Sequence, residues 1–366
     1  MFCCILSWTL ACVTATDNVA NEPAYLENGT PEVGGVRHLC LVYHGRAQRV
    51  PWTAEALLPY VTYVDERGKP VDWLFDSFLF IEFANDKGIS LYHDTGKKPW
   101  PTADDWKWLA DAWFRENTGL IGLERAMTTA GKALGETNRT ANVVISVPLP
   151  QRSIRQFGPL LGQDKVLDFS KPEDRRQALA WYIDQIWSRY NESDLPHLRL
   201  VGFYWMSESI AVADHDLVEW LARYIHEKGV KFYWIPYFKA AGVEKWKDRG
   251  FDAMMLQPNH FFHEKSPASR LQDTATRARK IGSGVEMEFD SRALDSEIFR
   301  EHFYDYLDAG AKHGWMTDSI LGWYEGGGAI KKMLDEPDKG RPLYDALYRF
   351  VKGTYMPREP NRPSVP

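Results

Sequence analysis

The sequence predicts a single (β/α)8 barrel of the TIM type, in the α/β class. Eight short apolar runs alternate with amphipathic helical patterns from residue 36 onward, as expected for a parallel sheet whose strands are buried on both faces. Such a barrel takes roughly 250 residues plus insertions, and the chain has 366. An open doubly wound sheet is the competing fold, but neither a G-x-G-x-x-G nor a Walker phosphate-binding motif occurs.

Strands and helices are predicted from the spacing of apolar residues and from capping residues. Thr102 with Asp105, and Ser170 with Glu173, have the spacing of capping boxes that begin helices. Gly229 is placed to end a later helix. The eight predicted strands are His38–His44, Ser77–Phe83, Asn142–Pro148, Leu198–Met206, Lys231–Tyr237, Phe251–Gln257, Gly284–Asp290 and Ile320–Tyr324.

The ends of the chain differ in composition from the barrel, which is predicted to span residues 36–355. Residues 1–35 resemble an export leader followed by a tether, and 356–366 form a Pro-rich tail. The leader ends in Leu-Ala-Cys, as in a bacterial lipoprotein, so Cys12 would carry the lipid. A truncated secretory signal or a misassigned start codon are the alternatives. We therefore expect a secreted or cell-envelope protein.

Composition excludes several classes of protein. With 44 basic and 50 acidic residues the formal charge is −6, so the chain lacks the excess of positive charge that nucleic-acid binding requires. A content of 44% hydrophobic and 26% charged residues is that of a globular protein. Aromatic residues make up 14% of the chain, and they serve either as core or as flat platforms for sugar rings.

Carboxylates gather at the carboxyl ends of the predicted strands, where TIM barrels place their active sites. In the seventh strand, side-chain alternation turns Glu286, Glu288 and Asp290 towards the barrel axis. Acids on the inner face of a buried strand are costly unless they are paired, hydrogen-bonded or functional. Glu286 has a structural alternative, which is pairing with an inward Arg or Lys.

Glu208 follows the fourth strand, where a large clan of retaining barrel glycosidases carries its acid/base; the nucleophile of that clan follows from the seventh strand. By this analogy Glu208 is the predicted acid/base and Glu288 the predicted nucleophile, with Glu286 or Asp290 tuning their pKa values. Glu286 also remains open as the nucleophile. The structural alternative for Glu208 is a first-turn carboxylate of the next helix.

Polar and aromatic residues near the same strand ends are candidates for substrate binding. Gln257 and Asn259 have amides that could hydrogen-bond sugar hydroxyls, although capping a loop is the alternative. Trp205, Trp234, Tyr237, Phe261, Trp323 and Tyr324 are the candidate stacking residues. The remaining candidates are His44, Asp76, Tyr204, Asp290 and Glu325.

The motifs at these positions resemble the bacterial family known as domain of unknown function 4855. The matching stretches are Phe75–Phe80, Gly202–Trp205 with Glu208, Trp234–Phe238, Leu256–Asn259 and Glu286–Phe289. The resemblance covers about residues 36–350 and implies a secreted, barrel-like protein of bacteria that process complex carbohydrate. It implies no particular substrate.

The resulting prediction is a glycoside hydrolase acting on a complex polysaccharide or glycan, without a cofactor. A non-catalytic glycan-binding protein on a barrel scaffold is the first alternative, and a metal-assisted hydrolase is the second. No metal site is expected, because His215, His260 and His263 have no companion at zinc spacing and no H-E-x-x-H occurs.

Overall fold

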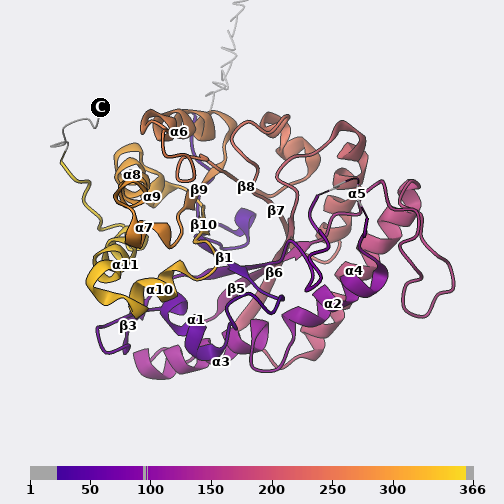
Figure 1. Ribbon diagram of the computed structural model, residues 1–366, viewed down its shortest axis with the longest axis horizontal. Helices are drawn as coiled ribbons and strands as arrows, with labels where there is room; N and C mark the ends of the chain where they lie inside the picture. Colours follow the sequence, from indigo (N-terminus) through magenta and orange to yellow (C-terminus); the bar gives the residue numbers. More distant parts are fainter. Residues whose placement is uncertain (1–22, 94–95, 97, 360–366) are drawn as a thin grey trace, which may run out of the picture.

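The computed structural model describes residues 23–93, 96 and 98–359, and it shows a closed barrel surrounded by helices (Figure 1). Eight parallel strands close in the order β1-β10-β9-β8-β7-β6-β5-β4, so the predicted TIM-type fold is confirmed. The barrel strands are β1 (His38–Tyr43), β4 (Ser77–Ile81), β5 (Ala141–Val147), β6 (Leu198–Trp205), β7 (Lys231–Trp234), β8 (Ala253–Leu256), β9 (Gly284–Glu288) and β10 (Leu321–Tyr324).

Helices fill the connections between these strands, and one antiparallel hairpin precedes β4. The α-helices are α1 (Ala54–Val61), α2 (Ala103–Trp113), α3 (Gly119–Leu134), α4 (Pro172–Glu192), α5 (His215–His226), α6 (Ser269–Ile281), α7 (Arg292–Asp295), α8 (Glu297–His313), α9 (Trp315–Asp318), α10 (Ala329–Asp335) and α11 (Pro337–Val351). The hairpin consists of β2 (Thr62–Val64) and β3 (Pro70–Trp73), and short 3-10 turns occupy Pro31–Val33, Val212–Asp214, Val243–Lys245 and Lys247–Arg249. No helix of the described part of the chain is long and apolar enough to cross a bilayer.

The two predicted capping boxes have different outcomes. Thr102 caps α2 as predicted, because its backbone N–H and its hydroxyl both donate to the Asp105 carboxylate, at 2.7 and 2.9 Å. Helix α4 instead begins at Pro172, since proline suits the first helical turn, where its missing N–H is not needed. Ser170 donates to Asp168 at 2.7 Å, so the predicted box at Ser170 is wrong.

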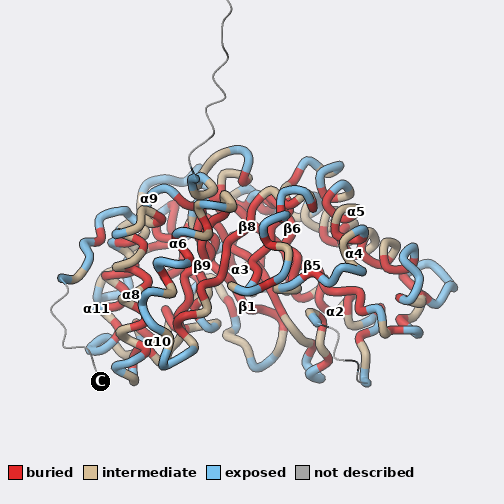
Figure 2. The backbone as a smooth tube through the Cα atoms, turned by 90° about the horizontal axis from the view of Figure 1, so that it is seen from above, coloured by how far each residue is buried: buried red, intermediate tan, exposed pale blue. Residues whose placement is uncertain are grey.

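Buried side chains form two clusters, an outer layer between the sheet and the helices and an inner layer within the barrel. Figure 2 shows that the buried residues lie mainly in the interior of the molecule and the exposed residues at its periphery. The outer layer fills the space between strands and helices, and large rings such as Trp106 and Trp113 of α2 are fully buried there. The inner layer includes Leu39, Leu79 and Met255, which fill the axis of the barrel. The barrel is therefore packed with side chains along its lower part and is not a pore.

The amino-terminal end of the barrel is closed by a segment that the sequence assigned to a tether. Val33 and Val36 are fully buried in the inner layer, and the Tyr233 hydroxyl donates to the Val33 carbonyl at 2.9 Å. The Tyr25 hydroxyl also donates to the His313 carbonyl at 3.1 Å. Residues 25–35, which were predicted to belong to the tether, thus pack with the barrel, whereas residues 1–22, including Cys12, lie outside the described residues.

The start of the predicted tail is also attached to the barrel. Arg358 donates to Asp308 at 2.8 Å and to Glu301 at 3.0 Å, both on α8. The Tyr355 hydroxyl bonds Asp308 as well, at 2.7 Å. These contacts hold the chain against α8 up to the end of the described residues.

Candidate active site

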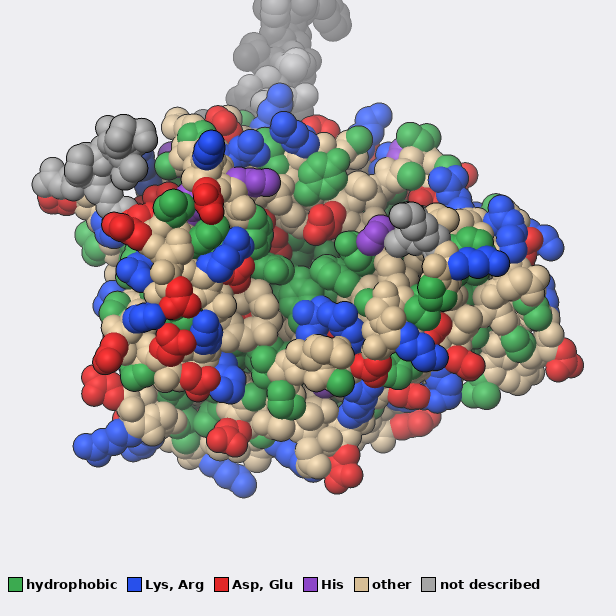
Figure 3. All heavy atoms as spheres, viewed as in Figure 1, with side chains coloured by type: hydrophobic (Ala, Val, Ile, Leu, Met, Phe, Trp, Pro, Cys, Tyr) green, Lys and Arg blue, Asp and Glu red, His purple; other side chains and the backbone are tan. Residues whose placement is uncertain are grey.

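A cavity of about 340 Å³ opens at the carboxyl ends of the barrel strands. Figure 3 shows this face hollowed near its centre, with hydrophobic side chains inside the hollow and charged side chains around it. Within the described part of the chain, no Lys, Arg or His is among the residues that line the cavity. The lining residues are Leu41, Tyr43, Ile81, Phe83, Tyr204, Glu208, Gln257, Asn259, Phe262, Glu286, Glu288 and Tyr324.

Three carboxyl groups face this cavity. Glu286 and Glu288 come from β9 and Glu208 from the segment after β6, two strands separated by β7 and β8 around the barrel. The intervening β9 residues Val285 and Met287 pack in the outer layer, so the predicted alternation is confirmed within β9. The strand ends at Glu288, and Asp290, which was also predicted to face the axis, does not line the cavity. No salt bridge reaches any of the three carboxylates from the described residues.

Glu288 accepts several hydrogen bonds. The Tyr306 hydroxyl of α8 donates to its Oε2, and Asn259 Nδ2 lies 3.4 Å from its Oε1. Burial raises the pKa of Glu288 to about 7, although the hydrogen bond from Tyr306 lowers it. The backbone N–H groups of Asn259 and His260 also lower the pKa of this carboxyl. These donors stabilise the carboxylate form of Glu288.

Glu286 lies two residues before Glu288 on β9, and none of the described residues gives it a comparable hydrogen bond. It is 3% exposed, and burial together with repulsion from Glu288 and Glu208 raises its pKa well above the ordinary value. Among the described residues no Arg or Lys pairs with it, so the structural alternative for Glu286 is not observed. Burial and the neighbouring carboxyl groups therefore favour the protonated form of Glu286.

Glu208 extends from a loop that buried groups hold in position. Trp234 Nε1 donates to the Ser207 carbonyl at 2.8 Å, directly before Glu208 in the chain. Burial raises the pKa of Glu208, and a hydrogen bond with Gln257 lowers it. Because Ser207 and Glu208 precede the 3-10 turn and α5, Glu208 is not a first-turn carboxylate of that helix.

Asn259 connects the elements on one side of the cavity. Its Oδ1 accepts from the Phe238 backbone N–H at 2.8 Å, and its Nδ2 donates to Gln257 Oε1 at 2.9 Å. Its backbone has φ +52°, a left-handed conformation that is uncommon for a residue other than glycine. Such conformations persist where the surrounding structure enforces them, often at functional sites.

Aromatic rings form another wall of the cavity. The Tyr43 ring meets Phe83 and Tyr324 edge-to-face, with centroids 5.4 and 5.7 Å apart. Phe262 meets Tyr324 in the same way at 5.4 Å. Carboxyl groups facing rings in one small cavity suit a ligand with hydroxyl groups and apolar C–H faces, such as a sugar.

A larger groove of about 610 Å³ adjoins the cavity, and Asn259 lines both. Tyr237, Lys239, Lys265 and Arg270 are among its lining residues. The Arg270 guanidinium lies over the Phe238 ring, 4.4 Å from its centroid. Tyr237 is 37% exposed, so this predicted stacking residue lies in the groove and not in the cavity.

The structure turns four other predicted stacking residues away from the cavity. Trp205, Trp234, Phe261 and Trp323 are each at most 1% exposed and pack in the outer layer. For Trp205 and Trp323 the reason is strand alternation, because each neighbours a tyrosine, Tyr204 or Tyr324, that faces the cavity.

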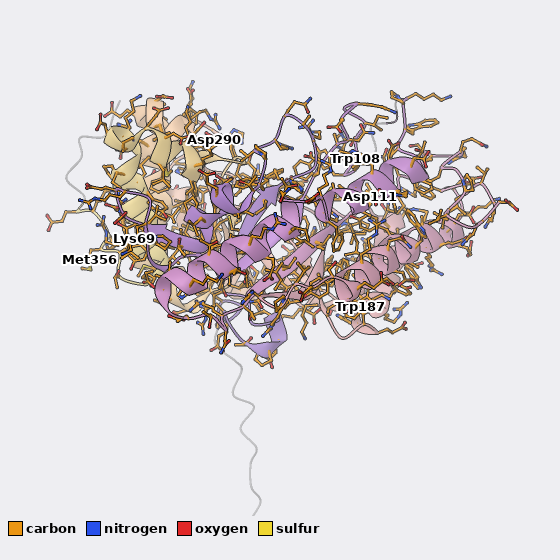
Figure 4. All side chains as sticks on the ribbon, turned by 90° about the horizontal axis from the view of Figure 1, so that it is seen from below. Lys69, Trp108, Asp111, Trp187, Asp290 and Met356 are labelled. Carbon is orange, nitrogen blue, oxygen red and sulfur yellow. The ribbon has the colours of Figure 1, made fainter. Side chains whose placement is uncertain are left out.

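Four polar candidates also lie outside the cavity, and their contacts explain why. His44 Nε2 lies 2.9 Å from the Ala112 carbonyl. Asp76 precedes β4, at the opposite end of the barrel, where it accepts from the backbone of Arg37 and His38. Glu325 accepts hydrogen bonds from Tyr60 Oη and from the Gly328 and Ile330 N–H groups. Asp290 pairs with Arg292 at 2.8 Å, and Figure 4 shows it beside the C-terminal helices.

Seven of the residues predicted for the site line the cavity. They are Tyr204, Glu208, Gln257, Asn259, Glu286, Glu288 and Tyr324. Sequence reasoning missed Tyr306, which reaches Glu288 from α8. In the sequence, Tyr306 lies at helical spacing with Phe299, Phe303 and Leu307, a pattern that predicts a core residue and not a site residue.

The family model for a domain of unknown function (DUF4855) matches residues 38–349. No curated protein matches the sequence. Among solved structures, a mutant tryptophan synthase α-subunit from the hyperthermophile Pyrococcus furiosus is 11% identical over 90% of this chain and 98% of its own, with a TM-score of 0.38. A second mutant of the same subunit gives the same identity and coverages with a TM-score of 0.39. Likeness this low carries no information on activity, whereas the family model covers most of the chain, which therefore belongs to the DUF4855 family.

Proposed function

We propose that the protein is a glycoside hydrolase that cleaves a complex glycan by two-carboxylate, retaining catalysis. The observation that carries this proposal is the position of Glu208, Glu286 and Glu288 around one cavity that no basic side chain of the described residues lines. Glycoside hydrolysis needs one carboxyl group to protonate the leaving oxygen and a second to act as nucleophile or base.

The surroundings of the carboxyl groups support different roles for them. Burial raises the pKa of Glu288 to about 7, and hydrogen bonds from Tyr306 and from the backbone of Asn259 and His260 oppose a further rise. Glu288 can therefore ionise near neutral pH, as a nucleophile requires. Glu208, with a pKa raised by burial, would carry the proton for the leaving group. Glu286 would stay protonated beneath them, and its ionisation would be opposed by any charge on its neighbours.

The reaction would proceed in two steps. A carboxylate oxygen of Glu288 attacks the anomeric carbon while Glu208 gives its proton to the departing glycosidic oxygen, which leaves as an alcohol. Glu208, now ionised, takes a proton from water, and the water oxygen attacks the anomeric carbon and releases Glu288. The aromatic wall and the Gln257 and Asn259 amides would hold the sugar ring, and the adjoining groove would hold further sugar units.

A panel of 2-deoxy-2-fluoro glycosyl fluorides, differing in sugar and anomer, tests the nucleophile directly. The fluorine slows hydrolysis of the glycosyl-enzyme, so the labelled residue is identified by peptide mass spectrometry. We expect a label on Glu288 and none in Glu288→Gln. Stable labelling of Glu286 in the parent would instead make Glu286 the nucleophile.

Glu208→Gln tests the acid/base on the substrate that the panel identifies. The variant should lose about 10²–10⁴-fold in kcat on the natural glycan. It should retain the first step on an aryl glycoside whose leaving group needs no proton. Glu55→Gln, an exposed residue of α1, is the matched control. Full activity of both Glu208→Gln and Glu288→Gln on the glycan would overturn the assignment, and tight glycan binding by the parent without turnover would favour a binding protein.

The proposal includes a location in the cell envelope or outside the cell, attached through a lipid on Cys12. Metabolic labelling with a radioactive fatty acid tests this part, with Cys12→Ala as the unlabelled control. Equal labelling of parent and variant would exclude Cys12 as the lipid site.

A further inference from the structure

A cluster of two histidines and one aspartate lies behind the cavity, outside its lining. His260 follows β8, and His302 and Asp305 are three residues apart on α8. One potential ligand atom from each lies within 4.8 Å of those of the other two. His260 is fully buried and His302 is 6% exposed. Tertiary structure thus supplies the companions that His260 lacks in the sequence.

Each of the two histidines has a hydrogen-bond partner outside the cluster at its Nδ1 atom. His302 Nδ1 lies 3.1 Å from the Phe261 carbonyl oxygen. Because a carbonyl only accepts, Nδ1 carries the hydrogen and Nε2 keeps its lone pair. His260 Nδ1 lies 2.9 Å from Ser266 Oγ, while its Nε2 lies 3.3 Å from Asp305 Oδ2. Metal-binding histidines are oriented in this way by a hydrogen bond on the other ring nitrogen.

We propose that His260, His302 and Asp305 bind a zinc ion. Two imidazoles and a carboxylate are a donor set that suits zinc and not Mg²⁺ or Ca²⁺, which prefer oxygen ligands throughout. Zinc–ligand distances of about 2.0–2.2 Å place neighbouring ligand atoms roughly 3.3 Å apart in a tetrahedron. The His260–Asp305 separation already has this value, and water would complete the tetrahedron.

The site has an entry path and a nearby competing cation. The Asp305 side chain is 26% exposed, whereas that of His260 is fully buried, so an ion would enter from the Asp305 side. The Arg358 guanidinium lies 3.8 Å from Asp305 Oδ1, and the other oxygen, Oδ2, faces His260. Each carboxylate oxygen therefore has a separate partner.

The zinc ion would be structural, and its position suggests what it stabilises. It would join the segment after β8 to α8 at the point where the His260 backbone N–H donates to the Tyr306 hydroxyl, at 3.3 Å. The same hydroxyl donates to Glu288, and Asn259 precedes His260 in the chain. The ion would thus fix two of the groups that surround Glu288 without facing the substrate.

Zinc titration of the full chain tests the proposal without any substrate. After treatment with a chelator and dialysis, the parent should bind one Zn²⁺ per chain by calorimetry, and Zn²⁺ should raise its thermal unfolding midpoint. Co²⁺ in its place should give the visible absorption of a tetrahedral site. Mg²⁺ and Ca²⁺ should not compete.

Variants locate the ion. Asp305→Asn and His302→Ala should weaken Zn²⁺ binding by at least about 100-fold, and Ser266→Ala by roughly 10-fold, as expected for a residue that orients a ligand. His263→Ala, exposed on the same segment, is the control and should bind like the parent. Asp305→Asn keeps the side-chain shape, so it decides the outcome if His302→Ala does not fold. Failure of the parent to bind stoichiometric Zn²⁺, or unchanged affinity in Asp305→Asn, would overturn the proposal whatever the catalytic activity.

Discussion

The buried carboxyl of Glu286 should make the stability of the protein depend on pH. Its pKa in the folded protein is raised well above the ordinary 4.5, so the folded state keeps a proton that the unfolded chain releases. The stabilisation is fully present below pH 4.5 and is lost as pH rises towards the folded pKa. The other titratable side chains that face the same cavity are Glu208, Glu288, Tyr43, Tyr204 and Tyr324. None of them carries a positive charge that would lower the pKa of Glu286.

Glu286→Gln removes this dependence while keeping the size of the side chain. Each pH unit over which folded Glu286 stays protonated costs the parent about 1.4 kcal/mol. Between the 4.5 of the free side chain and pH 7, the variant should therefore gain up to about 3 kcal/mol over the parent. Near pH 4.5 the two proteins should be about equally stable, because the Gln amide finds acceptors in the neighbouring carboxyl groups.

Urea unfolding followed by tryptophan fluorescence at pH 5, 6, 7 and 8 measures the difference. Glu55→Gln, the same replacement at an exposed position, is the control. Parallel curves for parent and Glu286→Gln would refute the reasoning, since they would mean that folded Glu286 is ionised like an exposed carboxyl. A loss of stability that is equal at all pH values is one form of this refuting result, and it would indicate that Glu286 acts through packing.

Three further substitutions separate positioning and substrate binding from folding. Trp234→Phe removes the N–H that holds the Ser207 carbonyl; kcat should fall while KM changes little, and an unchanged kcat would contradict this positioning role. Asp76→Asn weakens two backbone hydrogen bonds at the far end of the barrel; unfolding should become easier by about 1–2 kcal/mol with kcat/KM of the folded enzyme unchanged. Arg270→Ala opens the groove beside the cavity; KM should rise for a long glycan but not for a short aryl glycoside, and equal effects on both would place Arg270 in the cavity's own function.

The fold was predictable because strands buried on both faces have nearly continuous apolar sequences. All eight predicted runs coincide with barrel strands, including the short Leu321–Tyr324. For β9, the alternation of side chains was enough to predict that Glu286 and Glu288 face the barrel interior and that Val285 and Met287 face the helices. The same alternation places only one of Tyr204 and Trp205 at the cavity, so applying it to β6 would have excluded Trp205.

Other features depend on contacts that no local pattern contains. The polar segment before β1 has the composition of a linker, yet Val33 and Val36 fill the bottom of the barrel. Tyr306 has a place in a helical apolar stripe with Phe299, Phe303 and Leu307, which predicts core packing, and only the arrangement of α8 beside the β8 loop shows what Tyr306 contacts. Glu208 lies in a loop, where alternation gives no direction, so its position required the Trp234–Ser207 contact to be known.

The carboxyl groups of the cavity distinguish an enzyme from a binding protein on energetic grounds. A site that only binds sugar hydroxyls could use Gln or Asn, which hydrogen-bond without the cost of burying an ionisable group. If Glu286→Gln proves more stable at pH 7 and less active, the chain retains a carboxyl at the expense of its own stability, as active sites commonly do. If the variant is more stable and binds glycan as tightly as the parent, while the parent shows no turnover, the carboxyl does not serve catalysis and the result favours a binding protein. The joint measurement of stability and turnover therefore separates the two functions more sharply than either measurement does by itself.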